Sequence, residues 1–224
     1  MGERDATASR PVRRQEAKAI TRRRLLDAAL LTLDAEGPAA ITTTRVTRVA
    51  GISQSSFYVH FDDVDDLLRT TVAELALERR RLTRDARRTA RAAPCDVERL
   101  RQTFRVPLQT VLAHPMLFRL LLRTRHDAGS PLGEWSRSDA EASRAALVDD
   151  LAASGLPMTT VVDRRRTEMV ADCLIASTES LAVGHLDGRY PDVEEIVDML
   201  VRFCHGYFPS LRPALESPAK AVNG

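Results

Sequence analysis

The sequence has few cysteines and few aromatic residues, and both shortages limit what the protein can be. The three cysteines, Cys95, Cys173 and Cys204, are widely spaced and odd in number. They therefore form neither a CxxC metal knuckle nor a disulfide framework, and reduced thiols are expected. Aromatic residues make up 4% of the 224 residues and hydrophobic residues 44%. Aliphatic side chains must therefore fill the core of one large or two modest domains.

Long apolar runs are also missing. No stretch reaches the roughly 18 residues that a membrane span requires. The N-terminus is charged where a secretory signal would be apolar. We therefore expect a cytoplasmic protein with no membrane partner.

Catalytic signatures are absent as well. The chain contains no GxSxG, HExxH, GxGxxG or GK[ST] pattern. Its histidines are scattered and each stands alone: His60, His114, His126, His185 and His205. The four aspartates between Asp62 and Asp66 fit a helix start, where negative charge is favourable, better than a metal site. We predict that the protein is not an enzyme and needs no cofactor or metal.

Positive charge is concentrated near the N-terminus. Residues 1–24 hold eight basic and three acidic residues, a net charge of +5, whereas the other 200 residues hold 25 basic and 28 acidic ones, a net charge of −3. This asymmetry indicates a polyanionic partner, although a solvated tail would show it too. We expect residues 1–15 to form an unfolded basic arm.

The stretch from Thr42 to Phe61 has the pattern of two short helices around a glycine turn. Thr42 and Ser53 stand at capping positions and Gly51 at the turn. Val46, Val49 and Ala50 are expected to face inward on the first helix, and Phe57 and Phe61 on the second. Small polar residues then remain on the outer surface of the second helix, which suits insertion into a DNA major groove. Glutamine can hydrogen-bond a base edge in two places.

Residues Leu25 to Leu68 resemble the DNA-binding domain of TetR-family transcriptional regulators, a three-helix head with a helix-turn-helix. The resemblance rests on Ala28, Ala29, Gly37, Ala50, Gly51, Ser53, Tyr58, Phe61, Leu67 and Leu68. The chain departs from the family at Arg45, usually an acid, and at Val64, commonly a lysine that contacts DNA phosphate. Arg45 is therefore expected to add a phosphate contact, and the N-terminal arginines to offset the lost lysine.

A second stretch, FRLLLRTR at residues 118–125, resembles one branch of that family, the repressors of fatty-acid biosynthesis genes. In that branch the run is followed by a Gly-Ser or Ser-Gly turn, here Gly129 and Ser130, and by an amphipathic helix. The head segment from Ser56 to Leu67 matches the same branch, and it includes Val64.

Apolar residues at helical spacing continue to the C-terminus. They predict helices over residues 16–36, 65–90, 96–113, 132–153, 160–186 and 193–211, with Pro107 kinking the third or ending a turn. The fold class is therefore all-α, with about nine helices. We expect a helix-turn-helix DNA-binding domain over residues 16–68, a ligand-binding and dimerisation domain over 69–212, and a disordered tail over 213–224.

Three sets of site residues follow. The predicted DNA-binding residues are Arg13, Arg14, Thr42, Thr44, Arg45, Ser53, Gln54, Ser55, Ser56, Tyr58 and His60. Candidates to line an apolar ligand site are Phe104, Leu108, Leu112, Met116, Phe118, Leu121, Leu122, Arg123, Trp135, Met169 and Cys173, which would equally suit an ordinary core. The resemblance implies dimerisation through the last two helices, with Leu174, Leu181, Ile196, Val197, Leu200, Cys204, Tyr207 and Phe208 at the interface; burial within one subunit is the alternative.

These residues together predict a ligand-responsive regulator, most simply a repressor, that binds a palindromic double-stranded DNA operator as a homodimer. The effector would be small and apolar, with a long-chain acyl-CoA and control of lipid metabolism as the first hypothesis. A drug-responsive repressor of an efflux gene is the alternative within the class. A helical small-molecule enzyme or lipid-binding protein is the alternative outside it.

Overall fold

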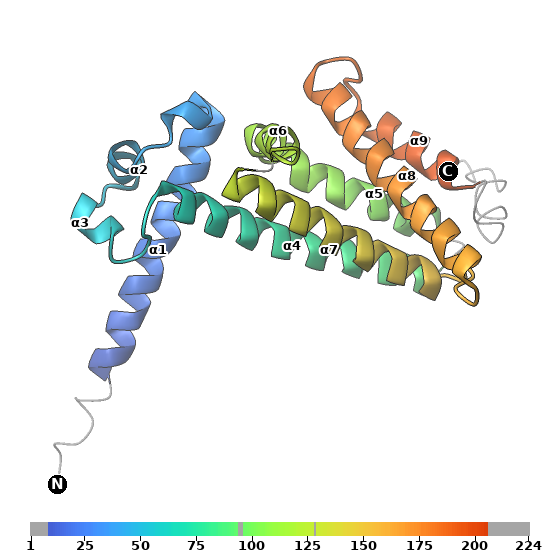
Figure 1. Cartoon of the computed structure of the whole chain (residues 1–224), viewed down its shortest axis with the longest axis horizontal. Coiled ribbons are helices and arrows are strands. Elements are labelled where there is room, and N and C mark those ends of the chain that lie inside the picture. The colour runs from blue at the N-terminus through green and yellow to red at the C-terminus, as the bar shows by residue number, and fades with distance from the viewer. Residues whose placement is uncertain (1–8, 94–95, 128, 206–224) are drawn as a thin grey trace, which may run out of the picture. The chain divides into compact units, whose positions relative to one another are not determined.

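The computed structural model describes residues 9–93, 96–127 and 129–205, and their regular structure is entirely helical (Figure 1). Nine α-helices and one short 3-10 helix confirm the predicted all-α fold within these residues. Their bounds are α1 Ser9–Glu36, η1 Pro38–Ala40, α2 Thr43–Ala50, α3 Gln54–Phe57, α4 Val64–Ala92, α5 Val97–Leu112, α6 Pro115–Thr124, α7 Pro131–Ala153, α8 Val161–Leu186 and α9 Val193–His205. Among them, none is both long enough and apolar enough to cross a lipid bilayer.

The chain forms two compact units. The head unit contains residues 1–75 and 116–136, and the body unit contains residues 76–115 and 137–224. Helices α4 and α7 each contribute to both. Contacts thus group α6 and the first turns of α7 with the N-terminal helices. The expected functional division at residues 68 and 69 remains a prediction.

The head unit is built around one apolar cluster to which five helices contribute. Leu25, Val46, Phe57 and Leu67, from α1, α2, α3 and α4, have no exposed surface. Leu117 of α6 and its neighbour Leu120 lie in the same cluster, and Leu132 and Trp135 of α7 pack against it. The head therefore takes part of its core from residues 116–136, which forty residues of the body unit, 76–115, separate in sequence from the rest of the head.

Helix α1 begins earlier than predicted. The helix starts at Ser9, so the expectation of an unfolded arm is wrong for residues 9–15, while residues 1–8 lie outside the described part of the chain. Pro11 falls in the first turn of the helix. A backbone N–H at that position makes no intrahelical hydrogen bond, so proline costs none there. The residues that follow include Arg, Gln, Glu, Ala and Lys, which are strong helix formers. The basic residues are therefore presented on a helix.

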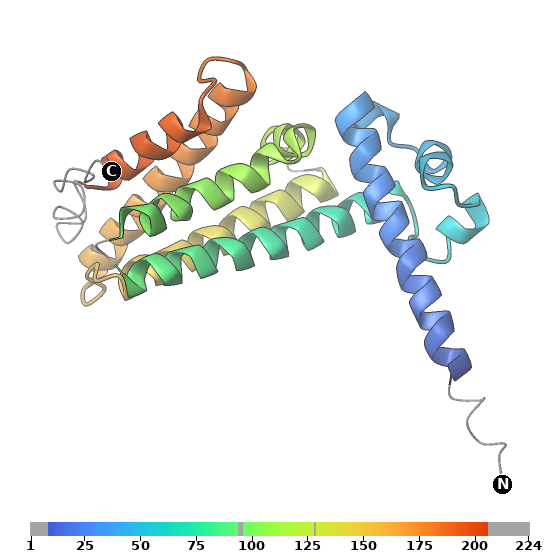
Figure 2. The ribbon, with the colours of Figure 1, turned by 180° about the vertical axis from the view of Figure 1, so that it is seen from behind.

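In the body unit, α5 packs against α8 and α9, and α8 packs against α9. Both views, in Figure 1 and Figure 2, show these helices side by side. Pro107 lies inside α5 without ending it, because the helix continues to Leu112. Helix α9 is described as far as His205. The predicted interface residues Tyr207 and Phe208 and the tail at residues 213–224 therefore lie outside the described part of the chain.

Ion pairs join α4 to α7 within the body unit. Arg79 Nη2 lies 2.7 Å from Asp139 Oδ2, and Arg80 contacts the other oxygen of that carboxylate. Two turns further along α4, Arg87 Nε lies 2.6 Å from Asp150 Oδ2. Both aspartate side chains are less than one-sixth exposed, at 13% and 15%. Charged pairs thus occupy a seam that aliphatic residues would usually fill.

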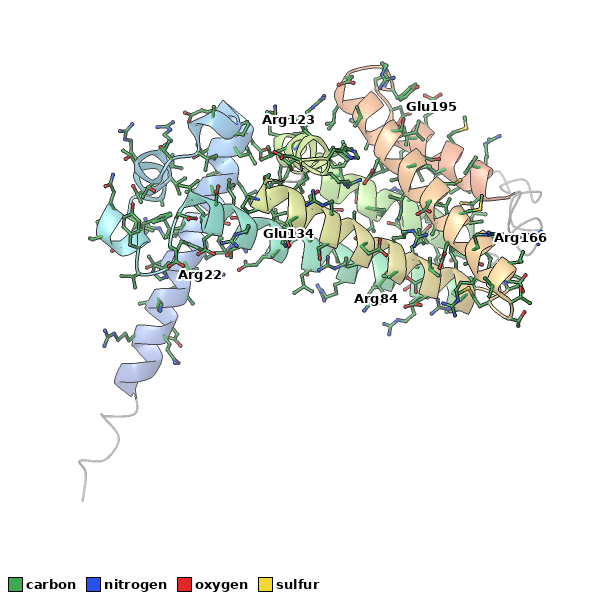
Figure 3. All side chains as sticks on the ribbon, viewed as in Figure 1. Arg22, Arg84, Arg123, Glu134, Arg166 and Glu195 are labelled. Atoms are coloured by element: carbon green, nitrogen blue, oxygen red, sulfur yellow. The ribbon has the colours of Figure 1, made fainter. Side chains whose placement is uncertain are left out.

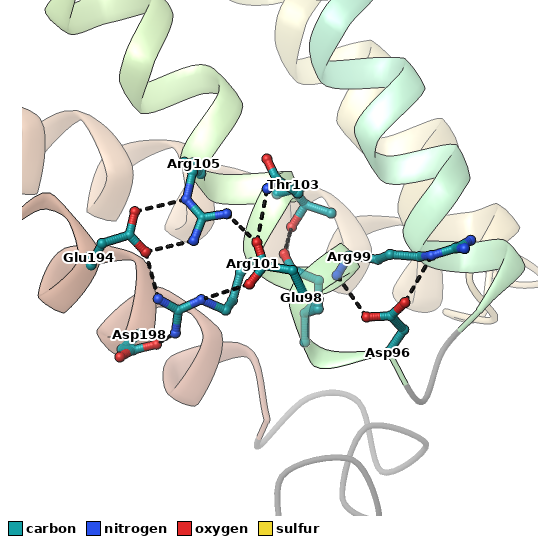
Figure 4. A network of polar contacts seen from close by, with 10 residues as sticks. Asp96, Glu98, Arg99, Arg101, Thr103, Arg105, Glu194 and Asp198 are labelled. Atoms are coloured by element: carbon teal, nitrogen blue, oxygen red, sulfur yellow. Dashed lines mark hydrogen bonds and ion pairs between the residues drawn. The ribbon is translucent and has the colours of Figure 1, made fainter. Parts of the chain in front are cut away.

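A second ionic network links α5 to α9 (Figure 4). Arg101 and Arg105 of α5 both place Nη2 2.6 Å from Oε2 of Glu194, and Arg101 also contacts Asp198. Hydrogen bonds from the two guanidinium groups lower the pKa of Glu194 from 4.5 to about 2. The two helices are therefore held together by charge at one end of α9 as well as by apolar packing.

Candidate nucleic-acid interface

Helix α2 is fixed at its N-terminus by a side-chain cap. The Thr42 hydroxyl accepts a hydrogen bond from the Arg45 backbone N–H at 3.2 Å, as the sequence predicts. Val46 and Ala50 are buried as predicted, but Val49 is 39% exposed, so its expected inward position is wrong. Thr47 takes that place, with its hydroxyl bonded to the Thr43 carbonyl at 2.7 Å. At 3.6 residues per turn, the buried face formed by Val46, Thr47 and Ala50 is centred between residues 46 and 47, and residue 49 falls beyond its edge although it is three residues from Val46.

The turn after α2 depends on a glycine and on an arginine from α1. Gly51 is in the left-handed conformation with φ of 63°, which costs little only without a Cβ. Arg24 donates to the Ala50 carbonyl oxygen at 2.6 Å, which satisfies an unpaired acceptor at the end of α2. Arg24 was not predicted as part of the site, because nothing local to the helix-turn-helix indicates its contact.

Helix α3 is a single turn with its large residue inside. The Ser53 hydroxyl accepts from the Ser56 N–H at 3.2 Å and caps it. Phe57 is fully buried, and the Tyr58 ring stands edge-on to it with centroids 5.3 Å apart while remaining 60% exposed. Phe61 is 3% exposed, which confirms the inward pair. The buried phenylalanine thus turns the serines, Gln54 and Tyr58 toward the outer surface.

The predicted DNA-contacting side chains are mostly open to solvent. Those classed as exposed are Arg14, Thr42, Thr44, Ser53, Gln54, Ser55 and Tyr58, and those partly exposed are Arg45, Ser56 and His60. Arg13 has helical backbone, but its side chain lies outside the described part of the chain. Across the turn, Gln54 Nε2 donates to Thr44 Oγ1 at 2.8 Å. This hydrogen bond joins the exposed sides of the two helices of the motif, which Figure 1 shows as neighbouring elements.

The unusual Arg45 already has a partner. Its Nε lies 2.9 Å from an oxygen of Glu36 at the end of α1, and a second nitrogen contacts the same carboxylate. The hydrogen bond with Glu36 raises the pKa of Arg45. A phosphate group at this position would have to compete with Glu36 or share the guanidinium with it.

His60 follows the helix-turn-helix and lies near positive charge. Its Nδ1 is buried and has no hydrogen-bond partner among the described residues. Burial lowers the pKa of His60, and the positive charges of Lys18 and Arg22 lower it further. Arg22 stacks over the Phe61 ring, with its guanidinium carbon 5.5 Å from the centroid, and pairs with Glu74. The lowered pKa favours the neutral form of His60 beside a basic stretch of α1.

Comparison with known proteins agrees with this geometry. Residues 25–71 match a family described as bacterial regulatory proteins, tetR family. Residues 25–71 are therefore a TetR-family DNA-binding domain. The match covers the helix-turn-helix and the start of α4, and it confirms the resemblance drawn from the sequence. TetR-family regulators are DNA-binding transcription factors without enzymatic activity, which also confirms that the chain is not an enzyme.

Solved structures share the fold over most of the chain. A TetR-like transcriptional regulator from Rhodococcus sp. RHA1 has a TM-score of 0.60 and 21% identity, over 84% of this chain and 96% of its own. A TetR-family regulator from Marinobacter aquaeolei VT8 has a TM-score of 0.57 and 20% identity, over 85% and 95%. The fatty acid degradation regulator FadR from Bacillus halodurans has a TM-score of 0.58 and 16% identity, over 81% and 94%. At these identities the likeness shows the fold alone.

The predicted ligand-site residues of this TetR-family chain fall in both units. Phe104 and Leu108 of α5 are buried in the body unit, where Leu112, Met169 and Cys173 also lie. Those in the head unit are Met116, Phe118, Leu121, Leu122, Arg123 and Trp135, of which Met116, Leu121 and Trp135 pack against the head core. Arg123 is exposed, as Figure 3 shows. Met169 and Cys173 are on the surface, so they do not line the interior of a single chain.

The predicted dimer residues are largely covered within one chain. Those classed as buried are Leu174, Ile196, Val197, Leu200 and Cys204, and Leu181 is partly buried. The exposed apolar side chains on the same two helices are different ones. Met169 on α8 is 60% exposed, and Met199 and Phe203 on α9 are 56% and 47% exposed. A contact with another chain through α8 and α9 would use these three residues first.

Proposed function

We propose that this TetR-family regulator is a ligand-responsive repressor that binds a palindromic operator as a homodimer in the cytoplasm. The observation that carries the proposal is the polar surface of α2 and α3, which is exposed and already ordered by its own hydrogen bonds. On this surface Gln54, Ser55 and Ser56 read base edges in the major groove. The flanking Thr42, Thr44, Arg45, Tyr58 and His60 contact phosphates, and Arg13 and Arg14 on α1 add positive charge.

Dimerisation through α8 and α9 is supported by the exposed apolar residues there. Met169, Met199 and Phe203 are large side chains that a lone chain leaves in water. Exposed on the same helix as Met169 are the small residues Cys173 and Ala176, which allow a second helix to approach closely. A two-fold arrangement would place two heads about one helical turn of DNA apart, roughly 34–36 Å.

An apolar effector acting through α6 is supported by where that helix packs. Leu117 and Leu120 belong to the head core. The same helix carries the FRLLLRTR run. A ligand that displaced α6 would therefore disturb the packing that orients α2 and α3. To change operator occupancy the ligand must bind the two states unequally, typically by about 1–3 kcal/mol.

A long-chain acyl-CoA is the effector we propose, with lipid metabolism as the regulated process. The support is the branch resemblance of residues 118–125 and the fold shared with a fatty acid degradation regulator. A drug-responsive repressor of an efflux gene has the same architecture and remains the second candidate. A lipid-binding role without DNA is the third, and the polar surface of α2 and α3 argues against it.

A selection from random-sequence duplex DNA with the full-length protein tests the DNA-binding proposal. We expect an inverted repeat, and we expect Tyr58→Ala to abolish retardation of the selected duplex. Gln54→Ala should relax the preference at one position in each half-site. Recovery of no common sequence would count against operator recognition. Palmitoyl-CoA should then lower affinity for the selected duplex, and a response to cationic dyes alone would favour the efflux alternative.

The dimer has a separate test. Phe203→Arg should shift the mass in solution from dimer to monomer, measured by light scattering after size-exclusion chromatography. Leu77→Arg on α4 is the matched control, because Leu77 is 65% exposed but is not on α8 or α9. Dissociation by both variants, or by neither, would show that the α8 and α9 face is not the interface.

A further inference from the structure

A hydrogen bond between the two helices of the motif bears on how the operator is read. Gln54 Nε2 donates to Thr44 Oγ1 at 2.8 Å, although the residues are ten apart in sequence. Both side chains are exposed on the surface that carries the other predicted DNA contacts. Neither residue needs the other for core packing, so the bond orders a surface amide.

The direction of the bond fixes what the amide can offer to a base. A carboxamide nitrogen carries two hydrogens and its oxygen accepts. With one hydrogen on Thr44, Gln54 has one N–H donor and the Oε1 acceptor left. Adenine presents N7 as an acceptor and N6–H as a donor in the major groove, which matches this pair in two places. Guanine presents two acceptors and thymine one, so the Oε1 atom has no partner on either.

Thr44 is itself held in place by the rest of the head unit. It lies on the first turn of α2, which the Thr42 cap and the contact between Arg45 and Glu36 tie down. At the other end of α2, Arg24 donates to the Ala50 carbonyl oxygen. The β-branched side chain of Thr44 has few χ1 rotamers. Thr44 Oγ1 is therefore held in front of the base-reading residue. A hydroxyl can donate as well as accept. Oγ1 is restricted to accepting from Gln54 when a DNA phosphate oxygen takes its hydrogen, which is the contact proposed for Thr44 above.

We infer that Thr44 is a positioning residue that sets the polarity of the Gln54 amide and so selects adenine at the base pair that Gln54 reads. Without the Thr44 hydroxyl, the Gln54 carboxamide can rotate about χ3 and exchange the positions of its N–H group and Oε1. That orientation suits the O6 of guanine or the O4 of thymine. The inference rests on the proposed base-reading role of Gln54. The Thr44 hydroxyl hydrogen stays available for a phosphate oxygen.

The test measures base preference. A binding-site selection with the wild type and with Gln54→Ala identifies the base pair that Gln54 reads. Affinities are then measured for the selected duplex and its three substitutions at that pair, with wild type, Thr44→Val, Thr44→Ser, Gln54→Ala and the double variant Thr44→Val/Gln54→Ala. Valine keeps the shape of threonine without the hydroxyl, and serine keeps the hydroxyl. Thermal melting of each variant checks that the head is folded.

A bidentate contact discriminates between bases by roughly 5- to 150-fold. We expect Thr44→Val to lose most of the preference for adenine over guanine at that pair, and Thr44→Ser to keep it. In the Gln54→Ala background, Thr44→Val should change no base ratio. An unchanged ratio in Thr44→Val, or an equal loss of affinity for every duplex, would overturn the positioning role and leave Gln54 as a reader. If Gln54→Ala changes no preference at any position, the reading role fails and the positioning role fails with it.

Discussion

The head unit and the body unit differ in where they place charged and polar side chains. In the head, the side chains with no exposed surface are apolar, and the outer surface of α2 and α3 carries serine, threonine and glutamine. In the body, aspartates that are only 13% and 15% exposed pair with arginines between α4 and α7, while Met169, Met199 and Phe203 face water. The body therefore carries charge in an interior seam. Exposed apolar side chains do not distinguish the units, because the head exposes Ile20, Leu31 and Val59 by more than 60%.

The difference also concerns what holds each unit together. Non-directional apolar burial dominates in the head, and it depends on keeping the core volume filled. The seam between α4 and α7 relies on ion pairs with defined geometry. Such pairs add little to the free energy of unfolding compared with apolar packing. Removing one partner, however, leaves the other charge buried and uncompensated. The body should therefore be sensitive to single charge deletions that the head, with its charges on the surface, would tolerate.

The largest effect should come from the head core. Phe57→Ala removes a fully buried aromatic ring that packs at centroid distances of 5.3 and 5.8 Å from Tyr58 and Phe61. We expect a loss of about 3–5 kcal/mol in the free energy of unfolding, measured by urea denaturation followed by circular dichroism. Tyr58→Ala is the control, because that ring is 60% exposed and its removal should weaken DNA binding far more than stability. A cost below about 1 kcal/mol for Phe57→Ala would mean that the head does not depend on this core.

A smaller effect is expected at the polar seam of the body. Asp139→Ala leaves Arg79 and Arg80 without their shared carboxylate, and both arginines are less than one-third exposed. We expect a loss of about 1–3 kcal/mol in the free energy of unfolding. Asp139→Asn should cost less, since its amide oxygen still accepts a hydrogen bond.

The matched control for Asp139 lies on α4. Asp85 pairs with Arg88 one turn away at 3.7 Å, and both side chains are more than half exposed. Asp85→Ala should change stability by less than about 0.5 kcal/mol. Equal effects of the two alanine variants would remove the distinction between the seam and the solvent-exposed surface.

Features set by a few neighbouring residues could be predicted from the sequence. The caps at Thr42 and Ser53, the left-handed Gly51 and the buried Phe57 all depend on residues within one helical turn, and the structure confirms them. The all-α fold and most helix bounds followed in the same way from apolar spacing. The early start of α1 was missed because residues 1–14 have no apolar periodicity, although strong helix formers after a first-turn proline are compatible with a helix.

Contacts between distant segments could not be predicted in this way. Arg24 with Ala50, Arg45 with Glu36 and Gln54 with Thr44 depend on how the helices cross. Apolar spacing shows that α6 has a buried face but does not show that Leu117 and Leu120 bury it in the head. On α9, apolar residues occupy so much of the helix surface that the sequence does not indicate which of them face solvent. The structure turns Ile196 and Val197 inward and leaves Met199 and Phe203 exposed.

The smallest expected effect concerns the exposed network between α5 and α9, and it depends on pH. The pKa of Glu194 falls from 4.5 to about 2 because Arg105 and Arg101 hydrogen-bond its carboxylate. A lowered pKa in the folded state means that the unfolded chain binds a proton first as the pH drops. The stabilisation by Glu194 is therefore complete above about pH 5 and is lost as the pH falls toward 2.

Melting temperatures of the wild type and Glu194→Gln, measured from pH 7 to the lowest pH at which the protein stays folded, test this dependence. We expect the wild type to be the more stable at pH 7 and the difference to shrink steadily below pH 5. Glu195→Gln is the matched control on the same helix, because Glu195 is exposed and forms no ion pair with the residues that the structure describes (Figure 3). That variant should follow the wild type at every pH. A difference for Glu194→Gln that stays constant down to the lowest pH would show that the α5 and α9 network contributes through shape and not through charge. The body would then resemble the head in what stabilises it.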